Sequence, residues 1–189
     1  MKKLNLSIVI PTRNRTSKII TTLKFLNNNS FFFKEIIIVD SSDSNISLSK
    51  KILSKYKKLD IKLIFSKPSI SLQRNIGLRN VNKNSVYVMF LDDDVNFEKN
   101  SLKKMYYFIK KSKFFNGLGF NLIIKKQNTL IEKIKKSGIF KFLGIYDNRL
   151  GVVTKSGWQT KATNLKKDQF VEWLPTQAVI YNFKKIKNK

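Results

Sequence analysis

Neither cysteine nor histidine occurs among the 189 residues of this chain. Their absence excludes disulfide bonds, thiolate and imidazole metal ligands, and every reaction that needs a cysteine nucleophile or a histidine base. A metal ion bound here must therefore be held by oxygen atoms, and a general base is expected to be a carboxylate. The 42% hydrophobic content can still bury a sizeable core, which indicates one folded domain, or one domain with an appended piece.

Acidic residues are scarce: 12 Asp and Glu stand against 38 Lys and Arg, which gives a net charge of +26. Such an excess is typical of proteins that bind nucleic acid or an anionic membrane. Here it is almost entirely lysine spread along the chain, a bias that AT-rich coding also produces. A basic nucleic-acid-binding α/β protein is therefore kept as the alternative function, with residues 110–115 and 135–141 as its basic and aromatic stretches. Nucleic acid is not the expected partner.

A long apolar segment is missing as well. No run of about 20 apolar residues could span a bilayer, and Met1-Lys2-Lys3 leads into a strand-like run rather than the core of a signal peptide. We therefore expect a cytoplasmic protein. The lysines and the cluster Phe31-Phe32-Phe33 leave a peripheral contact with the inner face of the membrane open.

Short apolar runs alternate with amphipathic segments in the first part of the chain. Strands are expected at Leu4–Ile10, Glu35–Val39, Ile61–Phe65 and Val86–Leu91, and helices at Thr16–Leu26, Ile46–Tyr56, Ser69–Val81 and Leu102–Ile109. Strands that alternate with helices of this length predict parallel βαβ units with helices on both faces. Residues 1–111 are thus expected to form an open α/β sheet.

The pattern is weaker after Phe114. The sequence predicts a strand at Leu118–Ile124, a short helix at Thr129–Lys136, an apolar patch at Gly138–Tyr146, a loop at Gly151–Thr163, and strands at Val171–Pro175 and Ala178–Phe183. A lysine-rich tail follows, for which no closing structural unit is expected.

The fourth expected strand runs directly into three acids, Asp92-Asp93-Asp94. Adjacent carboxylates repel one another, and they are costly at the edge of a core unless a cation or solvent compensates them. In an extended backbone Asp92 and Asp94 share one side while Asp93 points away. This spacing predicts a clamp for Mn²⁺ or Mg²⁺, because carboxylate oxygens without nitrogen or sulfur neighbours suit hard cations that also bridge phosphates.

Other polar residues follow the first two strands. Thr12 and Asn14 come after the first, and Asp40 ends the second. The carboxyl ends of parallel strands share one edge of an open α/β sheet, where ligands bind. Together with the three aspartates these residues indicate a nucleotide site at that edge, although Asp40 by itself is equally typical of a helix cap or a turn.

Four segments resemble GT-A fold glycosyltransferases of family 2, an inverting family. They are Ser7–Arg15 (opening strand and nucleotide loop), Ile36–Asp43 (second strand and its terminal acid), Gln73–Gly77 (Arg-Asn-x-Gly segment) and Phe90–Asp94 (Asp-x-Asp metal motif). The resemblance implies a Rossmann-like GT-A sheet and a metal bound by Asp92 and Asp94. The nucleotide contacts that it implies come from Pro11, Thr12, Asn14, Asp40, Arg74, Asn75, Asp92 and Asp93.

The resemblance also implies a reaction. A sugar would be transferred from a nucleotide diphosphate donor, a UDP-sugar by the family's habit, to the hydroxyl of a glycan or lipid-linked acceptor. Donor binding is expected in residues 1–111 and an incomplete acceptor side of the same domain in residues 112–189. The segment Glu172–Pro175 resembles the acceptor side, but Thr176 and Gln177 replace the glycines usual there.

The family's catalytic base is an acid that lies beyond the last expected strand, and this sequence stops before that position. The base is therefore unassigned, and Glu172 and Asp168, the only acids late in the sequence, are its candidates. If neither serves, a truncated form is expected that binds the donor and has little or no transferase activity.

Overall fold

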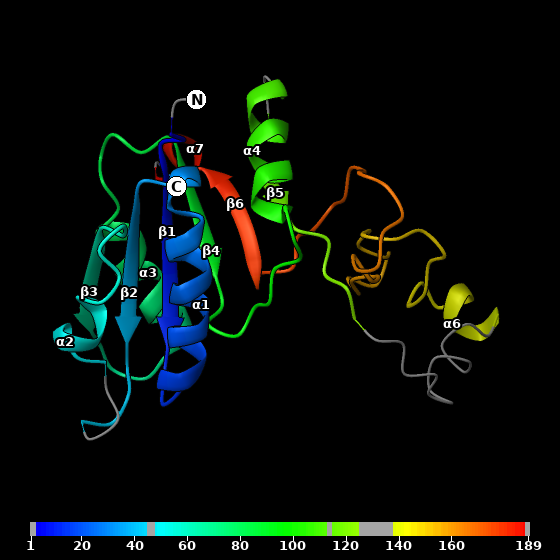
Figure 1. Ribbon diagram of the computed structural model, residues 1–189. Helices are drawn as coiled ribbons and strands as arrows, with labels where there is room; N and C mark the ends of the chain where they lie inside the picture. Colours follow the sequence, from blue (N-terminus) through cyan, green and yellow to red (C-terminus); the bar gives the residue numbers. More distant parts are fainter. Residues whose placement is uncertain (1–2, 45–47, 113–114, 125–137, 188–189) are drawn as a thin grey trace. The chain divides into compact units, whose positions relative to one another are not determined.

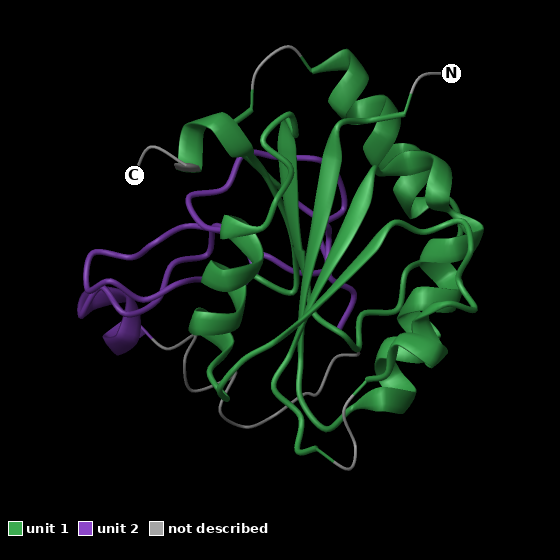
Figure 2. Cartoon of the chain, turned by 90° about the vertical axis from the view of Figure 1, so that its left-hand side faces the viewer, with its two compact units in different colours: residues 1–118, 176–189 green, residues 119–175 purple. Residues whose placement is uncertain are grey.

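The computed structural model describes residues 3–44, 48–112, 115–124 and 138–187. The chain divides into two compact units, which have different colours in Figure 2. Unit 1 comprises residues 1–118 and 176–189, and unit 2 comprises residues 119–175. The structural boundary differs from the expected division at residue 111, because the last segment of the chain returns to unit 1.

The described residues form a six-stranded sheet of order β3-β2-β1-β4-β6-β5 (Figure 1). Its strands are β1 (Leu6–Thr12), β2 (Glu35–Asp40), β3 (Ile61–Phe65), β4 (Tyr87–Leu91), β5 (Gly117–Gly119) and β6 (Ala178–Asn182). The pairs β1–β2, β2–β3 and β1–β4 are parallel, and β6 runs antiparallel to β4. Every residue of β1 and β2 is buried, as expected for parallel strands covered on both faces. The expected open α/β sheet is confirmed.

Helices lie on both faces of the sheet (Figure 2). The helical segments among the described residues are α1 (Thr16–Asn28), η1 (Ser30–Phe32), α2 (Lys50–Leu53), α3 (Ile70–Arg79), α4 (Ser101–Lys111), α6 (Gly138–Phe142) and α7 (Phe183–Lys187). On α1 the apolar residues Ile19, Leu23 and Leu26 recur at helical spacing and are fully buried, which fixes the side of the helix that packs inward. Within the described part of the chain, no helix is long and apolar enough to cross a membrane.

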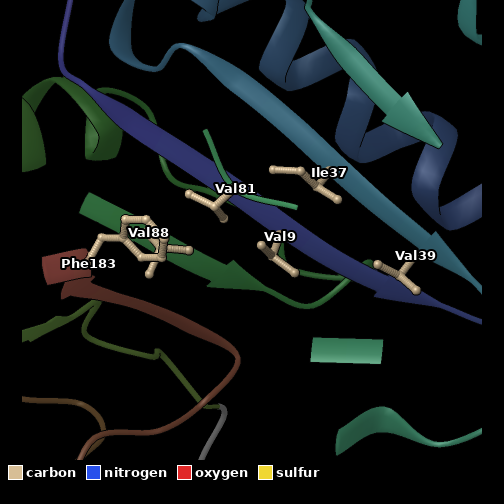
Figure 3. Packing of buried hydrophobic residues seen from close by; sticks show 6 residues of the cluster. All are labelled: Val9, Ile37, Val39, Val81, Val88 and Phe183. Atoms are coloured by element: carbon tan, nitrogen blue, oxygen red, sulfur yellow. The ribbon is translucent and has the colours of Figure 1, made fainter. Parts of the chain in front are cut away.

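A hydrophobic cluster packs one face of the sheet (Figure 3). Its buried members are Val9, Ile37, Val39, Val81, Val88 and Phe183. Four of them come from strands: Val9 from β1, Ile37 and Val39 from β2, and Val88 from β4. Ile76 of α3 packs against the cluster. Phe183 is the first residue of α7, so this last helix contributes to the core of unit 1. The expectation of a tail without a structural unit was therefore wrong.

Several expected elements of unit 1 have different ends, among them one helix and the first strand. Of the helix expected at Ile46–Tyr56, the described residues 48–56 contain only the four residues of α2. The first strand continues through Pro11 to Thr12 instead of ending at Ile10. Since the ladder between β1 and β4 ends at Val9, the missing N–H of Pro11 interrupts no hydrogen bond on that side.

Unit 2 contains fewer strands than the sequence predicts. The strand expected at Leu118–Ile124 amounts to β5 and a single bridge at Leu122, and residues 171–175 are not a strand. In this segment side chains form hydrogen bonds to backbone groups that a neighbouring strand would otherwise bind. The side-chain amide of Asn164 accepts a hydrogen bond from the N–H of Ile124 and donates one to the carbonyl of Ile124, each at 2.9 Å.

The expected strand at Ala178–Phe183 is present as β6, and the helix expected at 129–136 lies outside the described residues.

Gly77 allows α3 to pack closely against β1. It is buried on the side of α3 that faces the sheet, and a Cβ at this position would overlap the Cγ1 atom of Val9. The glycine is therefore required by close approach of helix and strand.

We expect Gly77→Ala to destabilise the protein by about 1–3 kcal/mol, because overpacking outweighs the better helix propensity of alanine. Urea unfolding followed by circular dichroism measures the change. Gly138→Ala is the matched control, since no atom of the described residues lies within 4 Å of the added methyl group. A Gly77→Ala variant as stable as the wild type would show that helix and strand can separate without cost.

A polar cluster is buried at the amino-terminal edge of the sheet around Glu35, which is 2% exposed. Its carboxylate accepts hydrogen bonds from the Ser7 hydroxyl at 2.6 Å, the Asn82 N–H at 2.7 Å and the Lys62 ammonium at 2.7 Å. Burial, the largest single influence, raises the pKa of Glu35. The bonds from Lys62, Ser7 and Asn82 together outweigh it and hold the pKa below its ordinary value.

Because the folded state lowers the pKa of Glu35, its stabilising contribution is complete above the ordinary glutamate pKa of about 4.3 and is lost as pH falls through the lower folded value. We expect Glu35→Gln to be less stable than the wild type near neutral pH and to lose less stability on acidification. Urea titrations across the acidic range measure this. Glu98→Gln, at an exposed acid, should keep the wild-type pH dependence. The same dependence in both variants would contradict the role of Glu35.

Candidate functional site

The carboxyl ends of β1 and β4 meet where the strand order reverses. From β1 the chain proceeds to β2 and β3 on one side, and then returns to β4 on the other side of β1. In open α/β sheets this switch point is where ligands bind. Thr12, the last residue of β1, donates its hydroxyl hydrogen to Oδ2 of Asp93 at 2.6 Å. The two strand ends are therefore joined directly.

Asp93 is the buried centre of this edge, at 4% exposure. Its Oδ1 atom accepts from the Arg15 guanidinium at 3.3 Å, and its backbone carbonyl accepts from the Thr22 hydroxyl at 2.8 Å. These contacts fix α1 and the loop before it to the end of β4. The hydrogen bond and charge of Asp93, followed by the charge of Asp94, raise the pKa of Arg15.

The neighbours of Asp93 are more accessible, although Asp93 and Asp94 lie in a turn after β4 and not in the extended backbone that the sequence predicted. The side chains of Asp92 and Asp94 are 24% and 48% exposed, against 5% for Asp93. Arg74 of α3 donates to Asp92 at 2.8 Å, and Arg15 donates to Asp94 at 3.1 Å. Burial raises the pKa of Asp92 above its ordinary value, although the Arg74 guanidinium opposes the shift. Each predicted metal ligand thus has an arginine counter-ion.

The loops after β1 and β2 are clamped together by Asn14. Its side-chain amide donates to Oδ2 of Asp43 at 2.8 Å and accepts from the Asp43 N–H at 3.0 Å. Its own backbone N–H donates to the Ser42 hydroxyl at 2.7 Å. Asn14 has a φ of 52°, a left-handed conformation that asparagine tolerates better than most residues. The clamp holds both loops at the proposed nucleotide edge.

Asp40 shapes the loop that follows β2. It is 1% exposed, and its two carboxylate oxygens accept from the backbone N–H groups of Ser42 and Leu48, each at 2.8 Å. This is the turn-forming role that the sequence left open for it. Since each carboxylate oxygen has more than one acceptor position, a contact from Asp40 to a nucleoside stays a prediction.

Gln73 belongs to this edge and was missed as a functional residue. It is 4% exposed, and its amide donates to the Thr12 carbonyl at 2.9 Å and to the Val39 carbonyl at 2.7 Å. The ends of β1 and β2 are therefore tied by one side chain of α3. The spacing in the sequence could have indicated this role. Gln73 precedes Gly77 by about one helical turn, so both residues lie on the side of α3 that faces the sheet.

The other predicted residues are less connected to this edge. Pro11 is buried within β1, and Asn75 is exposed on α3. The candidate bases lie in unit 2, where Oε2 of Glu172 accepts from the Val153 N–H at 2.7 Å and Asp168 is exposed. Glu172 therefore braces a loop of its own unit. Roles for all four residues in binding or catalysis stay predictions.

The donor set fits a hard divalent cation. Mg²⁺ is commonly held by one or two carboxylates, with waters and substrate phosphates as its other ligands. Asp92 and Asp94 supply such a pair of carboxylates. Among the described residues no three acidic side chains form a complete metal cage, so further ligands would have to come from the substrate or water.

The strand order, the antiparallel β6 beside β4, and the acids at the switch point define an α/β protein of the GT-A type. The model of the family "Glycosyl transferase family 2" matches residues 7–162, and the chain belongs to this family. The resemblance drawn from four short segments is thereby confirmed.

Relatives with named functions match part of the chain. This chain is 32% identical to the minor teichoic acid biosynthesis protein GgaA of Bacillus subtilis over 117 residues, and the matching region covers 58% of this chain and 26% of GgaA. It is 33% identical to the amylovoran biosynthesis glycosyltransferase AmsB of Erwinia amylovora over 109 residues, and the matching region covers 55% of this chain and 35% of AmsB. The match thus spans about a third or less of these relatives.

Solved structures share the fold. The S. aureus TarS structure of residues 1–349 has a TM-score of 0.62 at 19% identity, covering 97% of this chain and 48% of that one. The mannosyltransferase PcManGT from Pyrobaculum calidifontis, in complex with GDP-Man and Mn²⁺, has a TM-score of 0.58 at 11% identity, covering 98% and 46%. The expected GT-A fold is confirmed by these similarities.

We expect Gln73→Leu to destabilise unit 1 by about 1–3 kcal/mol, because two buried hydrogen bonds of about 0.5–1.5 kcal/mol each are lost. Urea unfolding measures the change. Arg79→Ala, at an exposed residue of the same helix, should stay within about 0.5 kcal/mol of the wild type. If Gln73→Leu unfolds at the wild-type urea concentration, the amide is not what ties β1 to β2.

Proposed function

We propose that this chain binds a nucleotide diphosphate sugar at the switch point between β1 and β4, for transfer of the sugar to an acceptor hydroxyl. The hydrogen bond from Thr12 to Asp93 carries the proposal, because it joins the loop after β1 to the acids after β4. Membership of glycosyl transferase family 2 supports the reaction class. The relatives named for teichoic acid and amylovoran biosynthesis favour a glycan or glycopolymer as acceptor.

In this proposal Asp92 and Asp94 hold Mn²⁺ or Mg²⁺ together with oxygens of the diphosphate. The bound cation would neutralise charge on the departing nucleoside diphosphate. Arg74, already paired with Asp92, would lie beside the same phosphates and keep that carboxylate oriented. The clamp between Asn14 and Asp43 would hold the two nucleotide loops in a fixed position relative to each other.

Transfer of the sugar also needs a group that activates the acceptor hydroxyl. Inversion requires a carboxylate that removes the proton of the acceptor hydroxyl as it attacks. Glu172 and Asp168 stay the candidate bases, and Glu172 already uses Oε2 to brace Val153. The cytoplasmic location and the peripheral membrane contact expected from the sequence also stay predictions.

The donor site predicts metal-dependent stabilisation by nucleotides. With UDP or GDP at about 100 times its Kd in the presence of Mn²⁺, we expect the melting temperature to rise by about 5 °C or more. Asp94→Ala should abolish the part of the shift that depends on Mn²⁺ and leave the fold intact, since Asp94 is an exposed side chain. Differential scanning fluorimetry measures both effects.

Asp60→Ala is the matched control, because Asp60 is an exposed acid that precedes β3 at the opposite edge of the sheet. It should respond to Mn²⁺ and nucleotide as the wild type does. Absence of any shift with every nucleotide would overturn the donor site. Salt-sensitive binding to nucleic acid that survives in Asp94→Ala would instead favour the basic nucleic-acid-binding alternative.

A further inference from the structure

One nitrogen of Arg15 contacts both the buried Asp93 and the exposed Asp94. Its Nη1 atom lies 3.3 Å from Oδ1 of Asp93 and 3.1 Å from Oδ2 of Asp94. A cation placed between two carboxylates in this way occupies coordination positions that a metal ion at Asp94 would use. Arg15 thus acts as an internal counter-ion where the proposed divalent cation would bind.

The side chain of Arg15 is able to leave this position while its backbone stays fixed. Its carbonyl accepts from the N–H groups of Lys18 at 2.9 Å and Ile19 at 3.1 Å, which anchors it at the start of α1. The side chain is 56% exposed and makes no helix-capping bond. Rotation about its own torsions can therefore carry the guanidinium away from the aspartates without moving α1.

Arg74 is more confined. Its side chain is 20% exposed and contacts Asp92 at 2.8 Å, with the Thr176 carbonyl at 3.5 Å. Its Nε atom is buried and has no hydrogen-bond acceptor among the described residues. Of the two arginines, Arg15 has the more exposed side chain and is the one that can exchange the aspartates for another anion.

The charge balance favours such an exchange. Asp92, Asp93 and Asp94 against Arg15 and Arg74 leave one negative charge at this edge. A divalent cation that entered with both arginines in place would reverse that sign and lie against the guanidinium of Arg15. A diphosphate resolves the conflict, because its oxygens accept the planar guanidinium fork and also bridge the metal ion.

We propose that Arg15 is a diphosphate-binding residue of the donor site, which pairs with Asp93 and Asp94 until the donor arrives and then turns to the phosphates. Metal and nucleoside diphosphate then bind cooperatively, each favouring release of Arg15 from Asp94. This inference rests on the donor site proposed above.

The test is a titration of the whole chain with Mn²⁺, followed by electron paramagnetic resonance of free Mn²⁺, with and without UDP or GDP. In the wild type the nucleotide should tighten Mn²⁺ binding about fivefold or more, within the usual range of coupling between sites. Arg15→Gln should bind Mn²⁺ alone more tightly than the wild type by a similar factor, and the gain from nucleotide should disappear.

Two further variants test the role of the planar guanidinium group and serve as a control. Arg15→Lys should retain part of the coupling, because an ammonium keeps the charge but not the planar fork. Arg79→Gln, at an exposed arginine at the end of α3 and outside the nucleotide loops, should behave as the wild type. Circular dichroism and the melting temperature without ligand show whether each variant is folded, and Arg15→Lys carries the test if Arg15→Gln is not.

The outcomes separate this inference from the donor site itself. If the wild type binds Mn²⁺ and nucleotide but Arg15→Gln and Arg15→Lys keep the wild-type affinities and coupling, Arg15 is only an ion pair and the inference is overturned while the donor site stands. Weaker binding of Mn²⁺ alone by Arg15→Gln would overturn it too, since Arg15 would then support the metal. A wild type that binds neither Mn²⁺ nor any nucleotide overturns both.

Discussion

Three carboxylates in succession at the end of a buried strand repel one another, and the edge of unit 1 is organised by the groups that compensate them. Asp93 points inward, where a hydroxyl from β1 and the guanidinium of Arg15 share its charge. Asp92 and Asp94 point outward, and each takes an arginine from a different element. The same contacts that lower the repulsion bring β1, α1 and α3 to the end of β4, so the geometry of the site follows from its electrostatics.

The acids of this strongly basic chain, with its net charge of +26, are partly inside the protein. Several of the few acids are used inside the protein, and Glu35, Asp40 and Asp93 are at most 4% exposed. Each of them accepts hydrogen bonds from named donors, which is the condition for burying a charge. Glu35 pairs with Lys62 and Asp93 with Arg15, so two of these buried acids still offset basic side chains that reach the surface.

Sequence patterns predicted the parts of the fold that local physics determines. The strand at Ile61–Phe65 was predicted with its observed ends, because a short apolar run between polar segments has few other conformations. The helix expected at Ile46–Tyr56 was too long, and the strand at 171–175 was wrong, because turns and side-chain hydrogen bonds satisfied the backbone there. Thr12 and the three aspartates were named from their place after strands. The partners that fix them were not, since Thr12 and Asp93 are 81 residues apart.

The return of the chain to unit 1 holds the edge that carries the three aspartates from its second side. The backbone N–H of Asp92 donates to the Gln177 carbonyl at 2.8 Å, in the segment that leads into β6. The first acid after β4 is therefore held from the β6 side, while Asp93 is held from the β1 side by Thr12. Both restraints come from residues of unit 1, and residues 119–175 lie between the two segments that build it. The contacts that orient the three aspartates are therefore made within unit 1, and sequence changes in residues 119–175 can leave them unchanged.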